Sequence, residues 1–213
     1  RRQARRRPLD DKALAVPADE DYNLALDQAG EALSRAGRVV VLSGAGISAE
    51  SGVPTFREAQ TGLWARFSPA DLASPEAFAK DPERIWAWYH WRRTLIARGG
   101  PNAGHHALAQ LADIKSLQII TQNVDGLHRA AGNRGVIDLH GRLDRVVCLA
   151  CDTRLSRNRV QEMLIEANAG WLHDSDAIRP DGDIELGDVD YDRFVVPDCP
   201  VCRGILKPDV VFF

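Results

Sequence analysis

The chain has 213 residues, of which 45% are apolar and 27% are charged, and its formal net charge at pH 7 is −3. A net charge this close to neutral gives no reason to expect a nucleic-acid partner, and no run of about 18 apolar residues is present that could cross a membrane. We therefore expect one globular unit with a sizeable core and a small annex, located in the cytoplasm.

The N-terminal segment is basic. The first seven residues, RRQARRR, contain five arginines. A run of like charges with almost nothing apolar to bury is typical of a solvated tail. We interpret residues 1–20 as a disordered basic arm rather than as a binding element.

Strand and helix patterns alternate along the rest of the chain. Apolar residues at steps of four, three and four across residues 21–36 predict an amphipathic helix. The run RVVVL that follows, and LQIIT at Leu117–Thr121, predict strands that are covered on both faces, as in a parallel sheet. Helical patterns between them lie at residues 75–79, 82–98 and 103–113. This alternation assigns the chain to the α/β class.

A glycine-containing turn directly follows the first predicted strand. It reads Gly44-Ala45-Gly46-Ile47-Ser48-Ala49 and fits the pattern G-x-G-x-x-A, in which backbone N–H groups approach a pyrophosphate. An ordinary dinucleotide-binding fold would continue with a crossover helix and an acidic residue about 20 positions later. Here the polar stretch AESGVPTFREAQTG follows instead. We interpret it as a lid over a bound ligand, and the alternative is an ordinary turn and surface loop.

Polar side chains also follow two later apolar runs. Gln122, Asn123 and Asp125 come directly after LQIIT, and His140 comes after VIDL. Open α/β sheets bind ligands outside the carboxyl ends of their strands. We therefore predict a ligand site at these strand ends, and the alternative for His140 is a packing or surface role.

The four cysteines form two pairs of the same spacing, Cys148-x-x-Cys151 and Cys199-x-x-Cys202. Two such turns complete a tetrahedral Zn²⁺ site. Disulfides are the alternative, but a cytosolic chain disfavours them, and a thioredoxin-like redox motif needs only one pair. We predict a structural zinc site that closes the intervening segment into a small domain and leaves no open position for catalysis.

Together these motifs resemble the sirtuins, a family of NAD-dependent protein lysine deacylases. The resemblance is carried by GAGISAESGVPTFR, PNAGHHAL, TQNVDGLHRAAG, LHG, the two C-x-x-C pairs and GILKPDVVFF, which occur in the family's order and approximate spacing. It implies a Rossmann-like parallel sheet with helices on both faces in an NAD-binding domain over residues 21–143 and 204–213. A small zinc-binding domain would occupy residues 144–203. Family members continue beyond KPDVVFF, so we expect the C-terminal part of the Rossmann-like domain to be missing here.

The resemblance also implies roles for individual residues. A mobile cofactor loop would include Thr55, Phe56 and Arg57, although many relatives have Asp at the position of Thr55. His140 would be the general base that removes a proton from the ribose hydroxyls, and Asn123 a second catalytic residue. The other residues expected to contact NAD are Gly44, Ala45, Gly46, Ser48, Gln122 and Asp125, with Asn123 also among them.

The spacing of two residues in a predicted helix indicates which acyl groups the protein would remove. Tyr89 and Arg92 are three residues apart in WAWYHWRR and therefore share one helical face. A phenol and a guanidinium that converge on a pocket bind a carboxylate by charge-assisted hydrogen bonds. This pair resembles that of sirtuins that remove succinyl, malonyl or glutaryl groups, and Ala73 matches the small residue that widens their acyl pocket. The alternative is an exposed arginine on an aromatic-packed helix. Val211 and Phe212 would lie against the acyl-lysine, where the substrate peptide pairs as an added strand.

We therefore predict an NAD-dependent protein lysine deacylase that acts on acylated lysine side chains of proteins and releases nicotinamide and O-acyl-ADP-ribose. The acyl group would be acetyl, succinyl or malonyl. The segment from HGRLDRVVCLAC through PDCPVC resembles the mitochondrial branch linked to ADP-ribosyl transfer. A mono-ADP-ribosyltransferase is therefore one alternative. A non-catalytic zinc-ribbon interaction module is another, but it leaves the polar residues at the strand ends unexplained.

Overall fold

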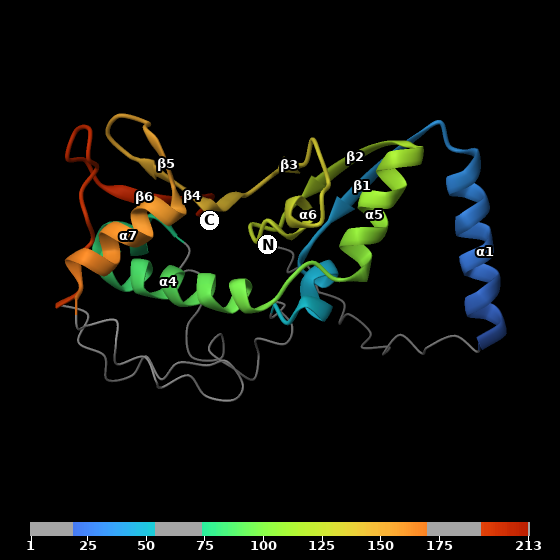
Figure 1. Cartoon of the computed structure of the whole chain (residues 1–213), viewed down its shortest axis with the longest axis horizontal. Coiled ribbons are helices and arrows are strands. Elements are labelled where there is room, and N and C mark those ends of the chain that lie inside the picture. Colours follow the sequence, from blue (N-terminus) through green and yellow to red (C-terminus); the bar gives the residue numbers. More distant parts are fainter. Residues whose placement is uncertain (1–18, 54–73, 170–192, 213) are drawn as a thin grey trace, which may run out of the picture. The chain divides into compact units, whose positions relative to one another are not determined.

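The structure is a computed structural model that describes residues 19–53, 74–169 and 193–212 (Figure 1). The chain divides into two compact units between Val39 and Val40. The described helix of the first unit is α1 (Asp19–Arg35), which confirms the amphipathic helix expected there. Its apolar residues stay accessible, with Tyr22 and Leu26 each 52% exposed.

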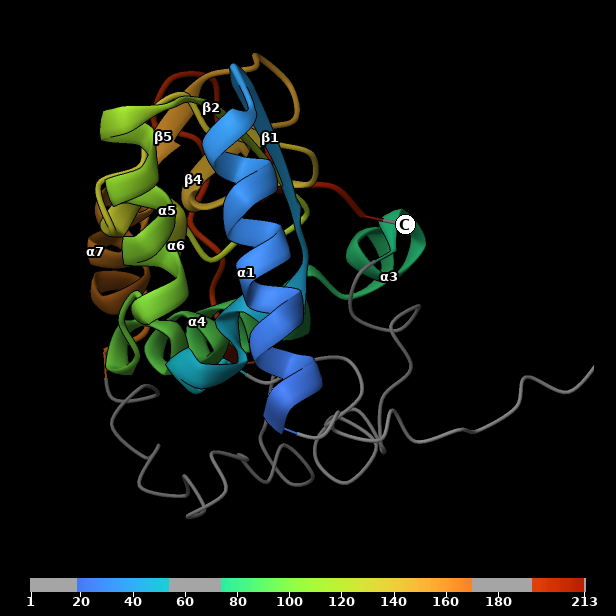
Figure 2. The same ribbon diagram turned by 90° about the vertical axis from the view of Figure 1, so that its right-hand side faces the viewer.

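The first sheet contains three strands in the order β1-β2-β3. They are β1 (Arg38–Ser43), β2 (Ser116–Thr121) and β3 (Ile137–Asp138). Strands β2 and β3 are parallel, with Ile120 opposite Ile137. Helix α5 (Ala103–Ile114) contacts both β2 and the short helix α6 (Leu127–Ala130) (Figure 2). Both apolar runs predicted as strands are therefore strands.

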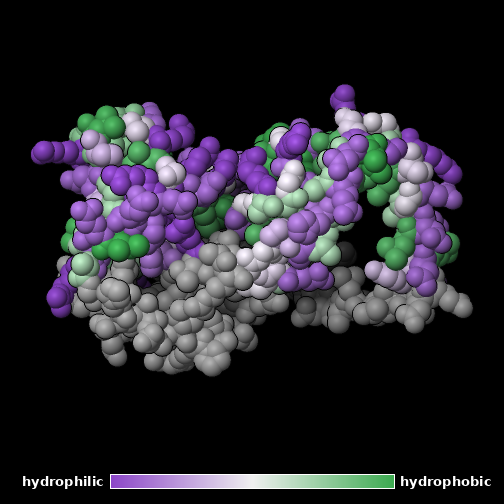
Figure 3. Space-filling model, in the orientation of Figure 1, coloured by the Kyte–Doolittle hydropathy of each residue, from purple (hydrophilic) through white to green (hydrophobic). Residues whose placement is uncertain are grey.

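The burial of β1 differs from what its apolar run predicted. Val40 and Leu42 are 60% and 66% exposed, whereas Val39 and Val41 are partly buried. Because successive side chains of a strand point to opposite faces, Val40 and Leu42 lie on the more exposed face of β1 and Val39 and Val41 on the other. In the space-filling view, hydrophobic patches lie among hydrophilic residues on the surface of the described residues (Figure 3). A continuous apolar run did not distinguish a strand buried on two faces from one buried on a single face.

A second sheet has the order β5-β4-β6, and both of its strand pairs are antiparallel. Its strands are β4 (Gly141–Cys148), β5 (Arg154–Ser156) and β6 (Leu206–Val210). Helix α7 (Arg157–Ala167) contacts β4 and β5, and the Ser156 hydroxyl caps it by accepting the Arg159 N–H. Strand β6, which comes from residues far along the chain, thus pairs with β4.

The core beside the second sheet includes three aromatic residues of α4 (Pro82–Arg98), which follows α3 (Pro75–Lys80). Trp86, Trp88 and Tyr89 are each at most 6% exposed. The Trp86 indole N–H donates to the Leu206 carbonyl at 2.9 Å, so α4 is bonded directly to β6. Burial of each such ring contributes on the order of 2 kcal/mol. Among the described helices, none combines the length and the apolar character that crossing a membrane requires.

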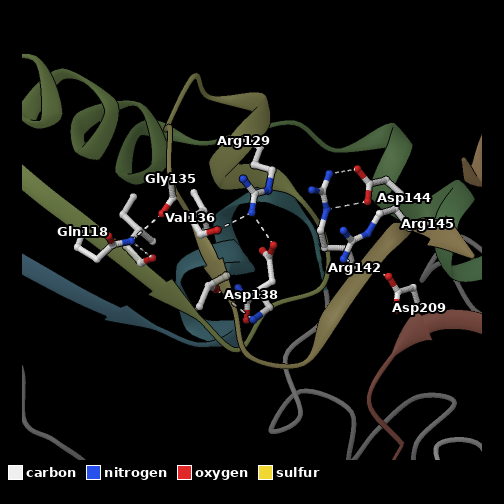
Figure 4. A network of polar contacts seen from close by, with 12 residues as sticks. Gln118, Arg129, Gly135, Val136, Asp138, Arg142, Asp144, Arg145 and Asp209 are labelled. Carbon is white, nitrogen blue, oxygen red and sulfur yellow. Dashed lines mark hydrogen bonds and ion pairs between the residues drawn. The ribbon is translucent and has the colours of Figure 1, made fainter. Parts of the chain in front are cut away.

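Charged residues of β4 and β6 lie close to one another (Figure 4). Asp209 on β6 forms ion pairs with Arg145 at 3.1 Å and with Arg154 at 3.4 Å. Arg142 pairs with Asp144 on its own strand. These side chains are partly exposed, so we attribute little stability to them and more to the backbone pairing of β4 with β6.

Gly141, the first residue of β4, is required by this backbone pairing. It has a φ of +80°, and a Cβ at its position would lie 2.1 Å from the Asp209 carbonyl oxygen. Positive φ and close backbone contact each exclude a side chain. The glycine that follows His140 is therefore explained by the packing of β4 against β6.

We expect Gly141→Ala to lower the free energy of unfolding by more than about 2 kcal/mol, because the clash adds to the cost of positive φ. Urea unfolding measures this difference. Gly100→Ala is the matched control, since Gly100 has open space around its Cβ position. Equal stability of the two variants would contradict the steric explanation.

Candidate functional site

The glycine turn forms a short 3₁₀ helix, η1 (Ala45–Ser51), which follows Gly44 in an extended conformation. The first bond of η1 runs from the Ile47 N–H to the Gly44 carbonyl at 3.2 Å. The N–H groups of Ala45 and Gly46 precede this bond, so the helix itself does not use them. Backbone donors are therefore free of the helical ladder at the position where the sequence predicts a pyrophosphate.

The polar residues after β2 are bonded to this turn. Asn123 Nδ2 donates to the Gly44 carbonyl at 3.0 Å and to Ser48 Oγ at 3.1 Å. Ser48 Oγ in turn donates to Asp125 Oδ2 at 2.8 Å, and Asp125 Oδ1 accepts the Leu127 N–H at 2.9 Å. The structure thus brings Asn123, Ser48 and Asp125 into one cluster, as expected for residues at adjoining strand ends.

Below this cluster lies a buried layer of polar side chains, in which the sequence indicated only a packing or loop-orienting role for the histidine. Ser43 ends β1, Thr121 ends β2, and His128 lies on α6; their hydroxyl and imidazole groups are hydrogen-bonded to one another. The Gln122 N–H also donates to the Ser43 carbonyl at 3.0 Å. For the hydroxyl partners of His128, the signal in the sequence is a hydroxyl residue at the last position of each strand.

Helix α5 supports the turn from a second side. Asn102 caps the helix by accepting the N–H groups of Gly104 and His105, and its Nδ2 donates to the Ile47 carbonyl at 2.7 Å. The His105 ring packs edge-on against the His128 ring, with 4.9 Å between centroids. Burial is the main cause that lowers the pKa of both imidazoles, so both are neutral near pH 7.

His140 lies beside the cluster. Its Nδ1 is 3.0 Å from the Gln122 carbonyl oxygen. Because a carbonyl only accepts, Nδ1 is the nitrogen that donates here, and Nε2 is the nitrogen of the neutral ring that could act as a general base. The His140 carbonyl accepts the Val211 N–H at 2.9 Å, which connects this residue to the end of β6.

Two of the residues predicted to bind substrate are in contact with each other. The Tyr89 ring stacks on the Phe212 ring, with 6.1 Å between centroids and 20° between planes. Lys207 Nζ lies 4.1 Å above the Phe212 ring and donates to the Val210 carbonyl at 2.6 Å. Burial lowers the pKa of Lys207, although Asp209 acts in the opposite direction. Val211, the third predicted residue, is 47% exposed.

The side chains of the remaining predicted residues lie outside the part of the chain that the structure describes. Arg92 belongs to α4, but its side chain lies outside the described residues. The same applies to the whole of Ala73, Thr55, Phe56 and Arg57.

The four cysteines converge at the end of β4. All four are free, and their Sγ atoms lie within 4.8 Å of one another. Cys148 is 3.4 Å from Cys202, and Cys151 is 3.9 Å from Cys199. Tetrahedral zinc with Zn–S bonds of about 2.3 Å needs sulfurs about 3.8 Å apart, so the four thiolates fit a structural Zn²⁺ site.

Gly204 contributes to this site through its lack of a side chain. A Cβ there would lie 2.6 Å from Ala150 Cβ and 3.0 Å from Cys148 Sγ. The N–H groups of Gly204 and Ala150 point at Cys202 and Cys148 sulfurs, each at 3.4 Å. Such donors stabilise thiolates that ligate a metal.

Comparison with known proteins identifies the family. Residues 44–213 match the Sir2 family. The chain belongs to this family. It is 46% identical over 202 residues to an NAD-dependent protein deacetylase of Xanthomonas axonopodis pv. citri, which covers 93% of this chain and 66% of that protein. NAD-dependent protein deacetylase 1 of Streptomyces coelicolor is 48% identical over 180 residues, covering 84% of this chain and 60% of that protein. The chain therefore spans just under two thirds of these relatives.

Solved structures agree with this assignment. A Sir2 homologue in complex with NAD is 37% identical, with a TM-score of 0.66, covering 88% of this chain and 61% of that one. A Sir2 protein bound to a propionylated peptide is 25% identical, with a TM-score of 0.65, covering 88% of this chain and 64% of that one. These similarities confirm the Rossmann-like sirtuin fold expected from the sequence.

We expect removal of zinc to unfold the second sheet. Without the metal, the four thiolates at the end of β4 repel one another and move apart. We expect about one zinc per chain by elemental analysis. Chelation should lower stability by at least about 3 kcal/mol and abolish the near-ultraviolet dichroism of the α4 tryptophans. A metal-free preparation with unchanged dichroism and melting temperature would contradict the assignment.

Proposed function

We propose that the protein is an NAD-dependent protein lysine deacylase. The observation that carries this proposal is the cluster in which Asn123 joins the glycine turn at Gly44 to Ser48 and Asp125, with His140 beside it. A non-catalytic zinc-ribbon interaction module would not require such a cluster. The names of the relatives, NAD-dependent protein deacetylases, support deacetylation as the core activity.

The proposed roles follow from the donors and acceptors at the site. Backbone N–H groups of the Gly44–Gly46 turn bind the pyrophosphate. Asn123 and Gln122 bind the nicotinamide ribose, and Asp125 accepts from the carboxamide of nicotinamide. The loop residues Thr55, Phe56 and Arg57 close over the cofactor. NAD supplies a ribose carbon that accepts the acyl oxygen as nicotinamide leaves.

His140 acts as the general base in this proposal. Its Nε2 accepts a proton from a ribose hydroxyl, while the Gln122 carbonyl holds Nδ1 and thus the orientation of the ring. The overall reaction consumes acyl-lysine, NAD and water and yields lysine, nicotinamide and O-acyl-ADP-ribose.

We further propose that acidic acyl groups such as succinyl and malonyl are substrates in addition to acetyl. Tyr89 packs on Phe212, and Arg92 lies one turn further along α4. Tyr89 and Arg92 would bind the acyl carboxylate in a pocket widened by Ala73. Val211 and Phe212 would contact the acyl-lysine of a protein substrate.

The domain boundaries are part of the same proposal. Residues 21–143 and 204–213 would form the NAD-binding domain, residues 144–203 the zinc-binding domain, and residues 1–20 a basic arm. Zinc binding by thiolates requires reduced cysteines, which favours a reducing compartment such as the cytoplasm.

Incubation with NAD and acetyl-, succinyl- and glutaryl-lysine peptides, followed by mass spectrometry, tests this function. We expect O-acyl-ADP-ribose and nicotinamide from the wild-type protein. His140→Ala should lower the rate about 10²- to 10⁴-fold, because it removes the proton acceptor, and should leave the zinc content unchanged.

His106→Ala is the matched control, since His106 is an exposed histidine on α5. Full activity of His140→Ala would contradict the proposed base. Transfer of ADP-ribose to protein without O-acyl-ADP-ribose would indicate a mono-ADP-ribosyltransferase instead.

A further inference from the structure

The buried layer below the site contains a histidine that the proposed reaction does not use. His128 is 2% exposed, and the hydroxyl residues beside it, Ser43 and Thr121, are 7% and 3% exposed. His128 Nε2 lies 2.8 Å from Ser43 Oγ, and Ser43 Oγ donates to Thr121 Oγ1 at 2.9 Å. One imidazole therefore connects α6 to the ends of both β1 and β2.

The direction of these bonds fixes the tautomer of His128. Ser43 has a single hydroxyl proton, which it gives to Thr121, so its oxygen accepts the proton carried by His128 Nε2. Nδ1 has no hydrogen-bond partner among the described residues, which suits the bare nitrogen of a neutral ring. Burial and the neighbouring His105 both lower the pKa of His128, while Asp125 and Asp138 act in the opposite direction.

The same chain of bonds reaches the ligand site. Thr121 Oγ1 accepts the backbone N–H of Asn123 at 3.1 Å. The side chain of Asn123 then bonds to the Gly44 carbonyl and to Ser48 Oγ. Any change in the orientation of the Thr121 hydroxyl therefore acts on the backbone from which the Asn123 carboxamide extends.

The position of His128 is restricted by hydrogen bonds to its backbone and by a contact on its ring. Its backbone carbonyl accepts two bonds from Asn133, from the N–H at 3.1 Å and from Nδ2 at 3.0 Å. Asn133 Nδ2 also donates to the His105 carbonyl at 3.0 Å, and the His105 ring packs against the His128 ring. The imidazole is thus fixed on its backbone side and on one ring face.

We propose that His128 is a positioning residue of the NAD site, which acts through Ser43 and Thr121 to hold Asn123 against the glycine turn. This inference rests on the function proposed above. Without the Nε2–H donor, the Ser43 and Thr121 hydroxyls lose a fixed orientation, and the Asn123 N–H loses a constant acceptor. The NAD site is then less ordered, and NAD binds more weakly.

Two substitutions at position 128 separate hydrogen bonding from packing. His128→Phe keeps a buried ring but has no donor, whereas His128→Gln retains an N–H near the position of Nε2. We expect His128→Phe to raise the calorimetric Kd for NAD about five- to tenfold, the effect of losing one buried hydrogen bond. Amide hydrogen exchange at Asn123 should become faster. His128→Gln should restore most of both properties.

Two further variants test whether general destabilisation, rather than the lost hydrogen bond, causes the higher Kd. Val160→Ala removes buried volume from α7, next to the second sheet, and should leave both the NAD Kd and the exchange at Asn123 unchanged. Thr121→Val combined with His128→Phe should raise Kd no more than the larger single effect, because both act along one chain of bonds. Additive effects of the two substitutions would overturn the proposal.

An NAD Kd for His128→Phe within about twofold of wild type would also overturn it, even if the melting temperature falls, because the role would then be structural only. If the wild-type protein binds no NAD, the proposed function fails. Exchange at Asn123 then decides the positioning claim by itself. Unchanged exchange in His128→Phe overturns that claim, and faster exchange that glutamine reverses supports it.

Discussion

The candidate site depends on how the ends of β1 and β2 are bonded to each other. The Gln122 N–H donates to the Ser43 carbonyl, and the Asn123 side chain donates to the Gly44 carbonyl. These two bonds hold the glycine turn beside the polar segment that follows β2. Without them the turn and the segment would be independent surface loops, and the donors that each contributes would not face one ligand.

His140 extends this arrangement to the second sheet. Its imidazole is held by the Gln122 carbonyl, and its own carbonyl accepts the Val211 N–H. The next residue, Gly141, allows β4 to approach the backbone of β6. The proposed base, the end of β2 and the segment proposed to contact the acyl-lysine are therefore connected through a few residues.

Local patterns in the sequence predicted much of this site. Residues such as Asn123 and Asp125 directly follow an apolar run, and two residues separate the cysteines of each pair, so each signal lies within a short window. The glycine turn likewise depends on adjacent residues. For these features the physical cause is local, so the sequence alone was sufficient to expect these side chains together, and their roles in binding NAD stay predictions.

Other features depend on contacts between distant residues. Ser43 and His128 are bonded across 85 positions, and neither residue type indicates the other. The pairing of β6 with β4 and the exposed face of β1 depend on how the sheets assemble, which an apolar run does not report. The resemblance to sirtuins included Gly141 in LHG, but only the structure gives the reason, a backbone contact with Asp209.

The most direct test of the shared ligand site is a crystal structure of the protein with ADP-ribose. We expect the diphosphate to accept hydrogen bonds from the N–H groups of Ala45 or Gly46, and a ribose hydroxyl to lie within hydrogen-bonding distance of Asn123. A diphosphate bound away from the glycine turn, or a ribose in contact with neither Asn123 nor Ser48, would contradict the claim that these strand ends form one site.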